Sequence, residues 1–245
     1  MKPFLLLQSR PEDLASDNEY EGFLTATGLK PHELQRIRVE AEPLPAINLD
    51  DFSGIIIGGG PFNTSTPADQ KSSLQKRVEH DFSRLLDDVV ARDFPLFGAC
   101  YGVGTLGAHQ GMVVSRKYGE PVGPVAITLT AEGHQDPLLT GLPPVFQAIV
   151  GHKEACEILP NDATILASSL TCPVQMFRIK TNLYATQFHP ELDLDGLKIR
   201  MAVYSNAGYF PPEDADKIIA NAQSADISFA PQILRNFVQR YHQKG

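Results

Sequence analysis

Residues 94–110 read FPLFGACYGVGTLGAHQ, and this stretch decides the fold. Its first part, residues 94–98, is a short apolar run typical of a buried strand, and residues 101–110 are predicted to form a helix. Between them, Cys100 stands at the centre of Gly-Ala-Cys-Tyr-Gly, a pattern that predicts a sharp strand-to-helix turn with room for a strained backbone. The helix would point its N-terminus at the Cys100 thiol, which favours a thiolate at that position.

The rest of the N-terminal half alternates in the same way between strand and helix. Strands are predicted over residues 4–8, 37–40 and 54–57, and helices over residues 11–28 and 70–92. In the second helix Leu74, Val78, Leu85 and Val89 recur at helical spacing, which gives it one apolar face. Such alternation predicts a three-layer α/β/α fold with a mostly parallel, doubly wound central sheet.

The second half of the chain changes character. Strand-like runs separated by short polar turns cover residues 112–115, 124–129, 145–150, 163–169, 174–179 and 183–188. We expect the last one or two to return to the parallel sheet and the others to form a small antiparallel side layer. Helices are predicted over residues 192–206 and 231–242. The simplest organisation is one domain over residues 1–245, with a core from about 4 to 206 and a helical extension over 212–245.

Composition and charge exclude several classes of function. The 245 residues are 42% hydrophobic and 20% charged, and the net charge of −8 comes without any block of Lys or Arg. A nucleic-acid groove or a membrane surface is therefore not expected as the partner. No signal peptide or run of about 18 apolar residues is recognisable, and three cysteines without a CxxC pair predict neither a disulfide framework nor a zinc cluster. We expect a cytoplasmic protein without a cofactor or metal.

A second informative segment, Phe188-His189-Pro190-Glu191, follows the strand predicted over residues 183–188. Pro190 biases His189 towards an extended backbone. Taken with Cys100, the segment supplies an imidazole base and a carboxylate to orient it, in the order Cys, His, Glu that nucleophilic catalysis can use. The alternative is a surface turn in which Glu191 caps the following helix.

A third segment, Gly58-Gly59-Gly60-Pro61, follows three consecutive isoleucines. Glycines after a strand let the backbone approach a ligand, and the N–H groups of Gly59 and Gly60 can form an oxyanion hole with the amide of Tyr101. The alternative is an ordinary glycine turn.

These segments together resemble the class I (triad) glutamine amidotransferases, of the stand-alone, GMP synthase amidotransferase-like kind. Gly98-x-Cys100-Tyr101-Gly102 is similar to the cysteine elbow of that family, residues 187–191 (QFHPE) to its closing segment, and residues 58–61 to its oxyanion turn. Residues 117–119 and 150–153 sit where the family has a Tyr-Gly pair and a Gly-His segment. The resemblance covers roughly residues 4–206.

The resemblance implies a flavodoxin-like amidotransferase fold and the hydrolysis of glutamine to glutamate and ammonia. Cys100 would attack the γ-carboxamide, His189 would protonate the leaving ammonia, and water would resolve a glutamyl thioester. The ammonia would pass to a separate synthetase subunit or other acceptor, because no synthetase domain follows residue 206 in this sequence.

One departure from the family concerns the substrate. The family has glutamine four residues after the cysteine, where this sequence has Gly104. Acyl transfer is unaffected, whereas recognition of glutamine itself is in question. A stand-alone γ-glutamyl amide or peptide hydrolase is therefore an alternative, and a non-catalytic amidotransferase-like binding module is another.

A rival motif overlaps the elbow. Residues 102–107 (GVGTLG) fit the GxGxxG pattern of dinucleotide-binding sites. A dinucleotide site would leave both Cys100 and His189 without a role, so we consider it the weaker interpretation.

Overall fold

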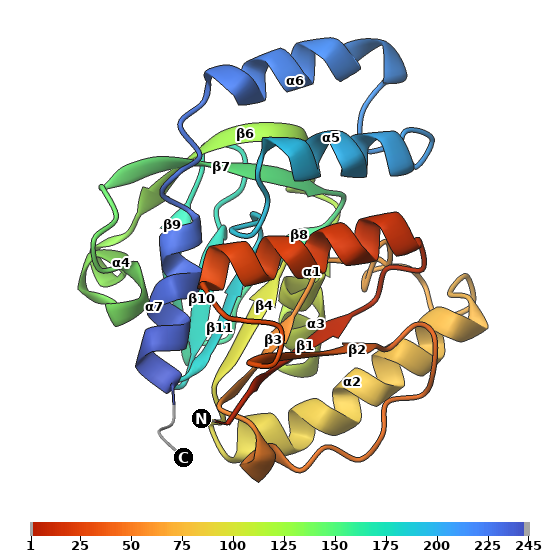
Figure 1. Ribbon diagram of the computed structural model, residues 1–245, viewed down its shortest axis with the longest axis vertical. Coiled ribbons are helices and arrows are strands. Elements are labelled where there is room, and N and C mark those ends of the chain that lie inside the picture. Colours follow the sequence, from red (N-terminus) through yellow and green to blue (C-terminus); the bar gives the residue numbers. More distant parts are fainter. Residues whose placement is uncertain (1, 243–245) are drawn as a thin grey trace.

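A computed structural model describes residues 2–242 of the chain and is built around one large mixed sheet (Figure 1). Its nine strands lie in the order β2-β1-β3-β4-β11-β10-β9-β6-β7. The mixed α/β class predicted from the sequence, with a mostly parallel core and a small antiparallel sheet, is confirmed.

The parallel half of the sheet comes mainly from the first hundred residues. Strands β1, β2, β3, β4 and β11 all pair in parallel. Their bounds are β1 (Phe4–Gln8), β2 (Leu34–Arg38), β3 (Gly54–Ile57), β4 (Leu96–Ala99) and β11 (Leu183–Thr186). Strand β2 lies earlier in the chain than the predicted residues 37–40. Strand β11, far away in sequence, pairs directly with β4, and this pairing matters most for the site.

The antiparallel half continues the same sheet beyond β11. These strands are β6 (Glu120–Leu129), β7 (Val145–His152), β9 (Ala163–Ser168) and β10 (Met176–Ile179). Only β5 (Val113–Ser115) and β8 (Ala155–Ile158) form a separate two-stranded sheet. The side layer expected from the sequence is thus smaller than predicted, because β6, β7 and β9 hydrogen-bond onto the main sheet.

Helices cover both faces of the sheet and complete three layers. Their bounds are α1 (Asp13–Thr27), α2 (Ser73–Ala91), α3 (Tyr101–His109), α4 (Ala131–Gln135), α5 (Leu194–Val203), α6 (Ala215–Ser224) and α7 (Pro231–Tyr241). Helices α1 and α7 lie in front of the sheet in Figure 1 and α3 lies behind it.

Strand alternation assigns each side chain of the central strands to one of the two layers. Phe4 and Leu6 of β1 pack with α1 and α7, whereas Leu5 and Leu7 pack with α2 and α3. All four are fully buried, which explains why β1 appears in the sequence as a continuous apolar run rather than an alternating one.

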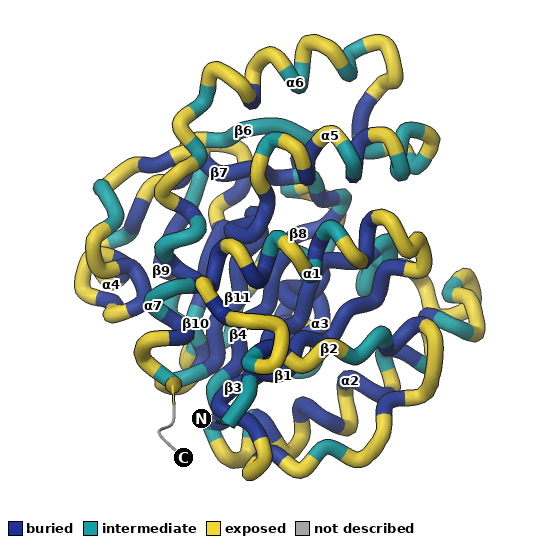
Figure 2. Tube along the Cα trace, viewed as in Figure 1, coloured by how far each residue is buried: buried dark blue, intermediate teal, exposed yellow. Residues whose placement is uncertain are grey.

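The chain after α5 forms a cover over the antiparallel half. Helix α6 lies within the helical extension expected over residues 212–245, although the sequence analysis did not give its bounds. It is mostly exposed at the top of the molecule in Figure 2, and it packs on α5 and β6 through a small apolar cluster. Among the described residues no helix is long and apolar enough to cross a membrane.

Candidate active site

The cysteine elbow lies where β4 ends and α3 begins. Cys100 has φ 52° and ψ −90°, a backbone conformation that a residue with a side chain rarely adopts. The glycine before it is required by space, since a Cβ on Gly98 would lie 2.9 Å from the backbone carbon of Gly102. The sequence pattern therefore predicted the strained turn correctly, and the thiol sits at the N-terminus of α3.

The pairing of β4 with β11 brings the second segment to the elbow. Thr186, the last residue of β11, is the partner of Ala99, and its carbonyl accepts a hydrogen bond from the Cys100 amide at 2.8 Å. The chain continues to His189, whose amide donates to Ile149 of β7 at 2.9 Å. Carboxyl ends of adjacent parallel strands meet at one edge of a sheet, so Cys100 and His189 face a common pocket.

His189 and Glu191 form a buried ion pair. The imidazole Nδ1 lies 2.9 Å from the Glu191 carboxylate, and neither side chain is more than 7% exposed. Burial of His189 disfavours its charge, but the attraction of Glu191 and of the Cys100 thiolate is stronger and raises its pKa to about 9. Burial likewise opposes the charge of Glu191, yet His189 and Arg200 together hold its pKa far below the usual range.

Arg200 of α5 is a member of this site that sequence reasoning missed. Its guanidinium donates to Glu191 at 2.9 Å and lies 3.1 Å from Nδ1 of His189. A guanidinium only donates, so the second contact is a hydrogen bond only while Nδ1 carries no proton. Nothing in the local sequence around residue 200 indicates this role.

The glycine turn follows β3 and lies beside the elbow, as expected. The amide of Gly59 donates to the carboxylate of Glu19 on α1 at 3.0 Å, so it is already used. Within residues 2–242 the amides of Gly60 and Tyr101 donate to no such acceptor, which leaves them free for an oxyanion. Gly60 leaves no room for a side chain, since a Cβ there would collide with the Ser9 hydroxyl.

A cavity of about 50 Å³ joins these groups. Cys100, His189 and Gly60 line it together with apolar side chains of β6, β7 and α5. Tyr204, Tyr209 and Phe210, from the segment after α5, complete the wall. Burial raises the pKa of Tyr209, and the neighbouring Cys100 thiolate raises it further.

The space that a side chain at position 104 would need is occupied. A Cβ on Gly104 would lie 2.6 Å from Oγ1 of Thr64 and 2.9 Å from a carboxylate oxygen of Glu154. That carboxylate accepts from the amides of Thr64 and Ser65 at 2.7 and 2.8 Å. The space beside Gly104 is thus filled by Thr64 and by a glutamate that anchors the loop of residues 64–65.

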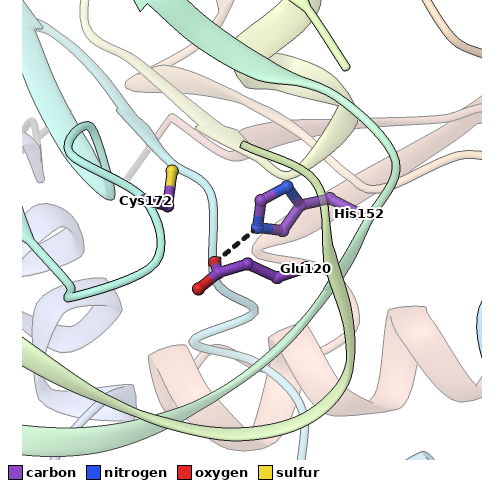
Figure 3. Close-up of side chains that lie close together, drawn as sticks. All are labelled: Glu120, His152 and Cys172. Atoms are coloured by element: carbon purple, nitrogen blue, oxygen red, sulfur yellow. Dashed lines mark hydrogen bonds and ion pairs between the residues drawn. The ribbon is translucent and has the colours of Figure 1, made fainter. Parts of the chain in front are cut away.

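A second Cys, His and Glu group lies elsewhere in the fold (Figure 3). Glu120, His152 and Cys172 have ligand atoms within 4.8 Å of one another, so among the described residues they are a set that could hold a metal. His152 is held at both ring nitrogens, by Glu120 at 2.7 Å and by the Glu154 carbonyl at 2.9 Å.

This group lacks the properties of a nucleophilic site. Cys172 is fully buried, and burial raises its pKa to about 12. Gln175 donates to the Glu120 carboxylate as well, at 2.6 Å, so that acid is satisfied by protein donors. These contacts indicate that His152 is a structural histidine and that Cys172 is a core residue.

The glycines of the rival GxGxxG pattern all lie within helix α3. Gly102 packs against Ile57 of β3, and Gly107 against Cys156 and Met112. In a dinucleotide site the first of these glycines would form the turn before the helix. Here they serve helix packing instead.

The sequence is similar to known proteins. Residues 26–201 match the family model of glutamine amidotransferase class-I. The chain is 30% identical over 165 residues to one of the subunits of the glutamine-hydrolysing GMP synthase of Thermoplasma acidophilum, covering 65% of this chain and 76% of that one. It is 29% identical over 160 residues to a glutamine amidotransferase-like protein of Salmonella typhimurium, covering 64% of each.

A solved structure extends the likeness to the whole fold. The crystal structure of a glutamine amidotransferase from Thermotoga maritima shares the fold over the full length of both chains, with a TM-score of 0.79 at 17% identity. Because the family model spans well over half of the sequence, this chain belongs to the class-I glutamine amidotransferase family.

Proposed function

We propose that the protein is a cysteine amidohydrolase that converts glutamine to glutamate and ammonia, with Cys100 as nucleophile, His189 as acid and base, and Glu191 as the carboxylate that orients it. The observation that carries the proposal is the buried His189–Glu191 pair, which shares a pocket with a cysteine on a strained elbow. The raised pKa of His189 favours an imidazolium beside the Cys100 sulfur near neutral pH.

In the first half of the reaction the Cys100 sulfur bonds to the amide carbon, and the carbonyl oxygen becomes an oxyanion facing the amides of Gly60 and Tyr101. His189 gives its proton to the nitrogen, the carbon–nitrogen bond breaks, and ammonia leaves a glutamyl thioester. His189 then takes a proton from water as the water oxygen attacks the thioester, and the proton returns to the departing sulfur.

The ammonia acceptor is proposed to be a separate protein. Support comes from the relative in Thermoplasma acidophilum, which is named as one subunit of a GMP synthase, and this chain covers 76% of its length. We infer that a synthetase subunit or another amine acceptor docks on this chain.

A second candidate, a stand-alone hydrolase of γ-glutamyl amides or peptides, uses the same three residues. It is favoured by one observation, the occupation of the space at Gly104 by Thr64 and Glu154. Without a glutamine side chain at that position, the site is free to recognise a substrate other than glutamine.

The test is mass spectrometry after incubation with a diazo-ketone analogue of glutamine, with Cys100→Ala as control. A single adduct on Cys100 that free glutamine suppresses is the expected result. Alkylation of Cys100 by iodoacetamide but not by the analogue would favour the γ-glutamyl hydrolase. A Cys100 that reacts with neither reagent would refute both enzymatic proposals and favour a binding module.

A further inference from the structure

Three charged side chains near the site take no part in the mechanism above, and they are all buried. Glu19 of α1 is 0% exposed, Arg10 is 5% exposed and Arg200 is 7% exposed. Burying charges is costly unless they are paired and hydrogen-bonded, so their arrangement needs a reason. That reason lies in what Glu19 contacts.

One oxygen of the Glu19 carboxylate holds two parts of the site together. Oε1 accepts from Nε of Arg10 at 2.8 Å and from the amide of Gly59 at 3.0 Å. The other oxygen accepts from the Gln8 side chain at 3.1 Å. Gly58 also packs tightly on this carboxylate, with space for no Cβ. Glu19 therefore fixes the turn that carries the Gly60 amide.

The same oxygen also lies near Arg200, which contacts the histidine–glutamate pair. Nη2 of Arg200 lies 3.8 Å from Oε1 of Glu19 and 2.9 Å from the carboxylate of Glu191. Arg200 thus stands between two buried acids, one from helix α1 and one from the closing segment. Two negative and two positive charges, counting Arg10, alternate across the site.

We propose that Glu19 is a positioning residue that couples the two halves of the site, the glycine turn and the His189–Glu191 pair. It acts on the turn directly, through the Gly59 amide. It acts on the pair through Arg200, which it keeps in place behind Glu191. This inference rests on the proposed function, because it concerns the same reaction.

The network predicts how charge changes move the titration of His189. Among residues 2–242 the charged or titratable groups around the imidazole are Cys100, Glu191, Arg200, Arg10, Glu19, Tyr204 and Tyr209. Replacing Glu19 by Gln leaves two buried guanidiniums without their shared counter-charge, which disfavours the imidazolium. Removing Arg200 has the opposite effect, because its charge and its contact with Nδ1 both favour the neutral ring.

The experiment is an NMR titration of histidine-labelled protein, with the His189 signal assigned by its loss in His189→Gln. In the wild type His189 should titrate near pH 9. Glu19→Gln should lower that value by about one pH unit, and Arg200→Met should raise it. Asp17→Asn is the matched control, because Asp17 lies on the same helix and pairs with Arg36 at 2.6 Å on the surface. It should leave the titration unchanged.

Each outcome has one meaning. An unchanged His189 titration in Glu19→Gln would overturn the positioning role. If that variant does not fold, Arg200→Met decides, and the absence of a rise would overturn the coupling. Failure of the proposed function looks different, because then His189 of the wild type titrates near 6.5 and Cys100 reacts with iodoacetamide no faster than a free peptide cysteine.

The rate of Cys100 alkylation gives an independent readout. At about pH 8.5, between the two expected pKa values, Glu19→Gln should slow it about threefold, because the imidazolium that stabilises the thiolate falls from about three-quarters to about one-quarter of the molecules. Arg200→Met raises the pKa of His189, so it should not slow the alkylation. A merely structural role of Glu19 would lower the denaturation midpoint while leaving the alkylation rate of the folded protein unchanged.

Discussion

The strained backbone at Cys100 can be tested by substitution. Glycine usually destabilises a folded protein relative to alanine, but at position 100 it should stabilise the fold. Cys100 has φ 52° and ψ −90°, a region that costs a residue with a Cβ about 1–3 kcal/mol. Glycine adopts it freely but loses about 0.5–1 kcal/mol more in conformational entropy on folding than alanine does. Both replacements remove the sulfur, so comparing Cys100→Gly with Cys100→Ala isolates the backbone.

From these two magnitudes, Cys100→Gly should be more stable than Cys100→Ala by roughly 0.5–2 kcal/mol in the free energy of unfolding. Urea denaturation followed by circular dichroism measures it. The matched control is Ala108→Gly, an exposed position in the same helix α3, which should lose about 1 kcal/mol. If Cys100→Gly instead falls below Cys100→Ala by that same amount, the elbow is not strained and the argument is refuted.

Three further predictions concern the pair and the pocket. Burial opposes the charge of His189, but Glu191 and the Cys100 thiolate raise its pKa from 6.5 to about 9. A group whose pKa is raised by folding stabilises the folded state fully at a pH below its pKa in the unfolded chain. That stabilisation is lost as the pH rises to its pKa in the folded protein. The free energy of unfolding should therefore fall by roughly 3 kcal/mol between pH 6.5 and 9. Urea titrations across that range measure it, and a curve as flat as that of His189→Gln would contradict the assignment. Gly104→Gln should lower stability by about 1–3 kcal/mol, since its side chain displaces Thr64 and the Glu154 carboxylate, and a fully stable variant in urea would count against it. Glu191→Gln should reduce kcat for amide hydrolysis by about 10²–10⁴-fold with little change in KM, because the ring loses its orienting charge but the substrate wall is intact; equal kcat in steady-state assays would exclude Glu191 from the mechanism.

The sequence predicted the elbow and its partner segment because both signals are local. Glycines flanking Cys100, and a proline after His189, each mark a turn at a strand end. Their meeting followed from one further rule, that parallel strands share their carboxyl edge. The pairing of β4 with β11 supplied what that rule needed.

The rest of the site could not be read in this way. The bond between Glu19 and the Gly59 amide joins residues forty positions apart. Arg200 lies close to Glu19 on α1 and contacts Glu191, which is nine positions earlier in the chain. No periodicity in the sequence distinguishes Arg200 from a surface arginine. The expectation that the Gly59 amide is available to a substrate was wrong, because the sequence does not show that this amide donates to Glu19.

The fold shows the same limit. Alternation predicted strands correctly but could not say which sheet they join, so β6, β7 and β9 were assigned to a side layer although they extend the main sheet. The extension over residues 212–245 was expected to be helical, but the bounds of α6 were not predicted, because Gly208 and Pro211-Pro212 signal the end of a helix without indicating that another begins at Ala215.

The wall of the pocket formed by Tyr204, Tyr209 and Phe210 lies beyond residue 201, where the match to the family model ends. The proposed reacting groups and this part of the pocket wall therefore come from different segments of the sequence. Substitutions at residues 204–210 therefore change the shape of the pocket wall without changing Cys100, His189 or Glu191, the residues proposed to carry out the reaction. For an engineer, the same division makes residues 204–210 the place to randomise first.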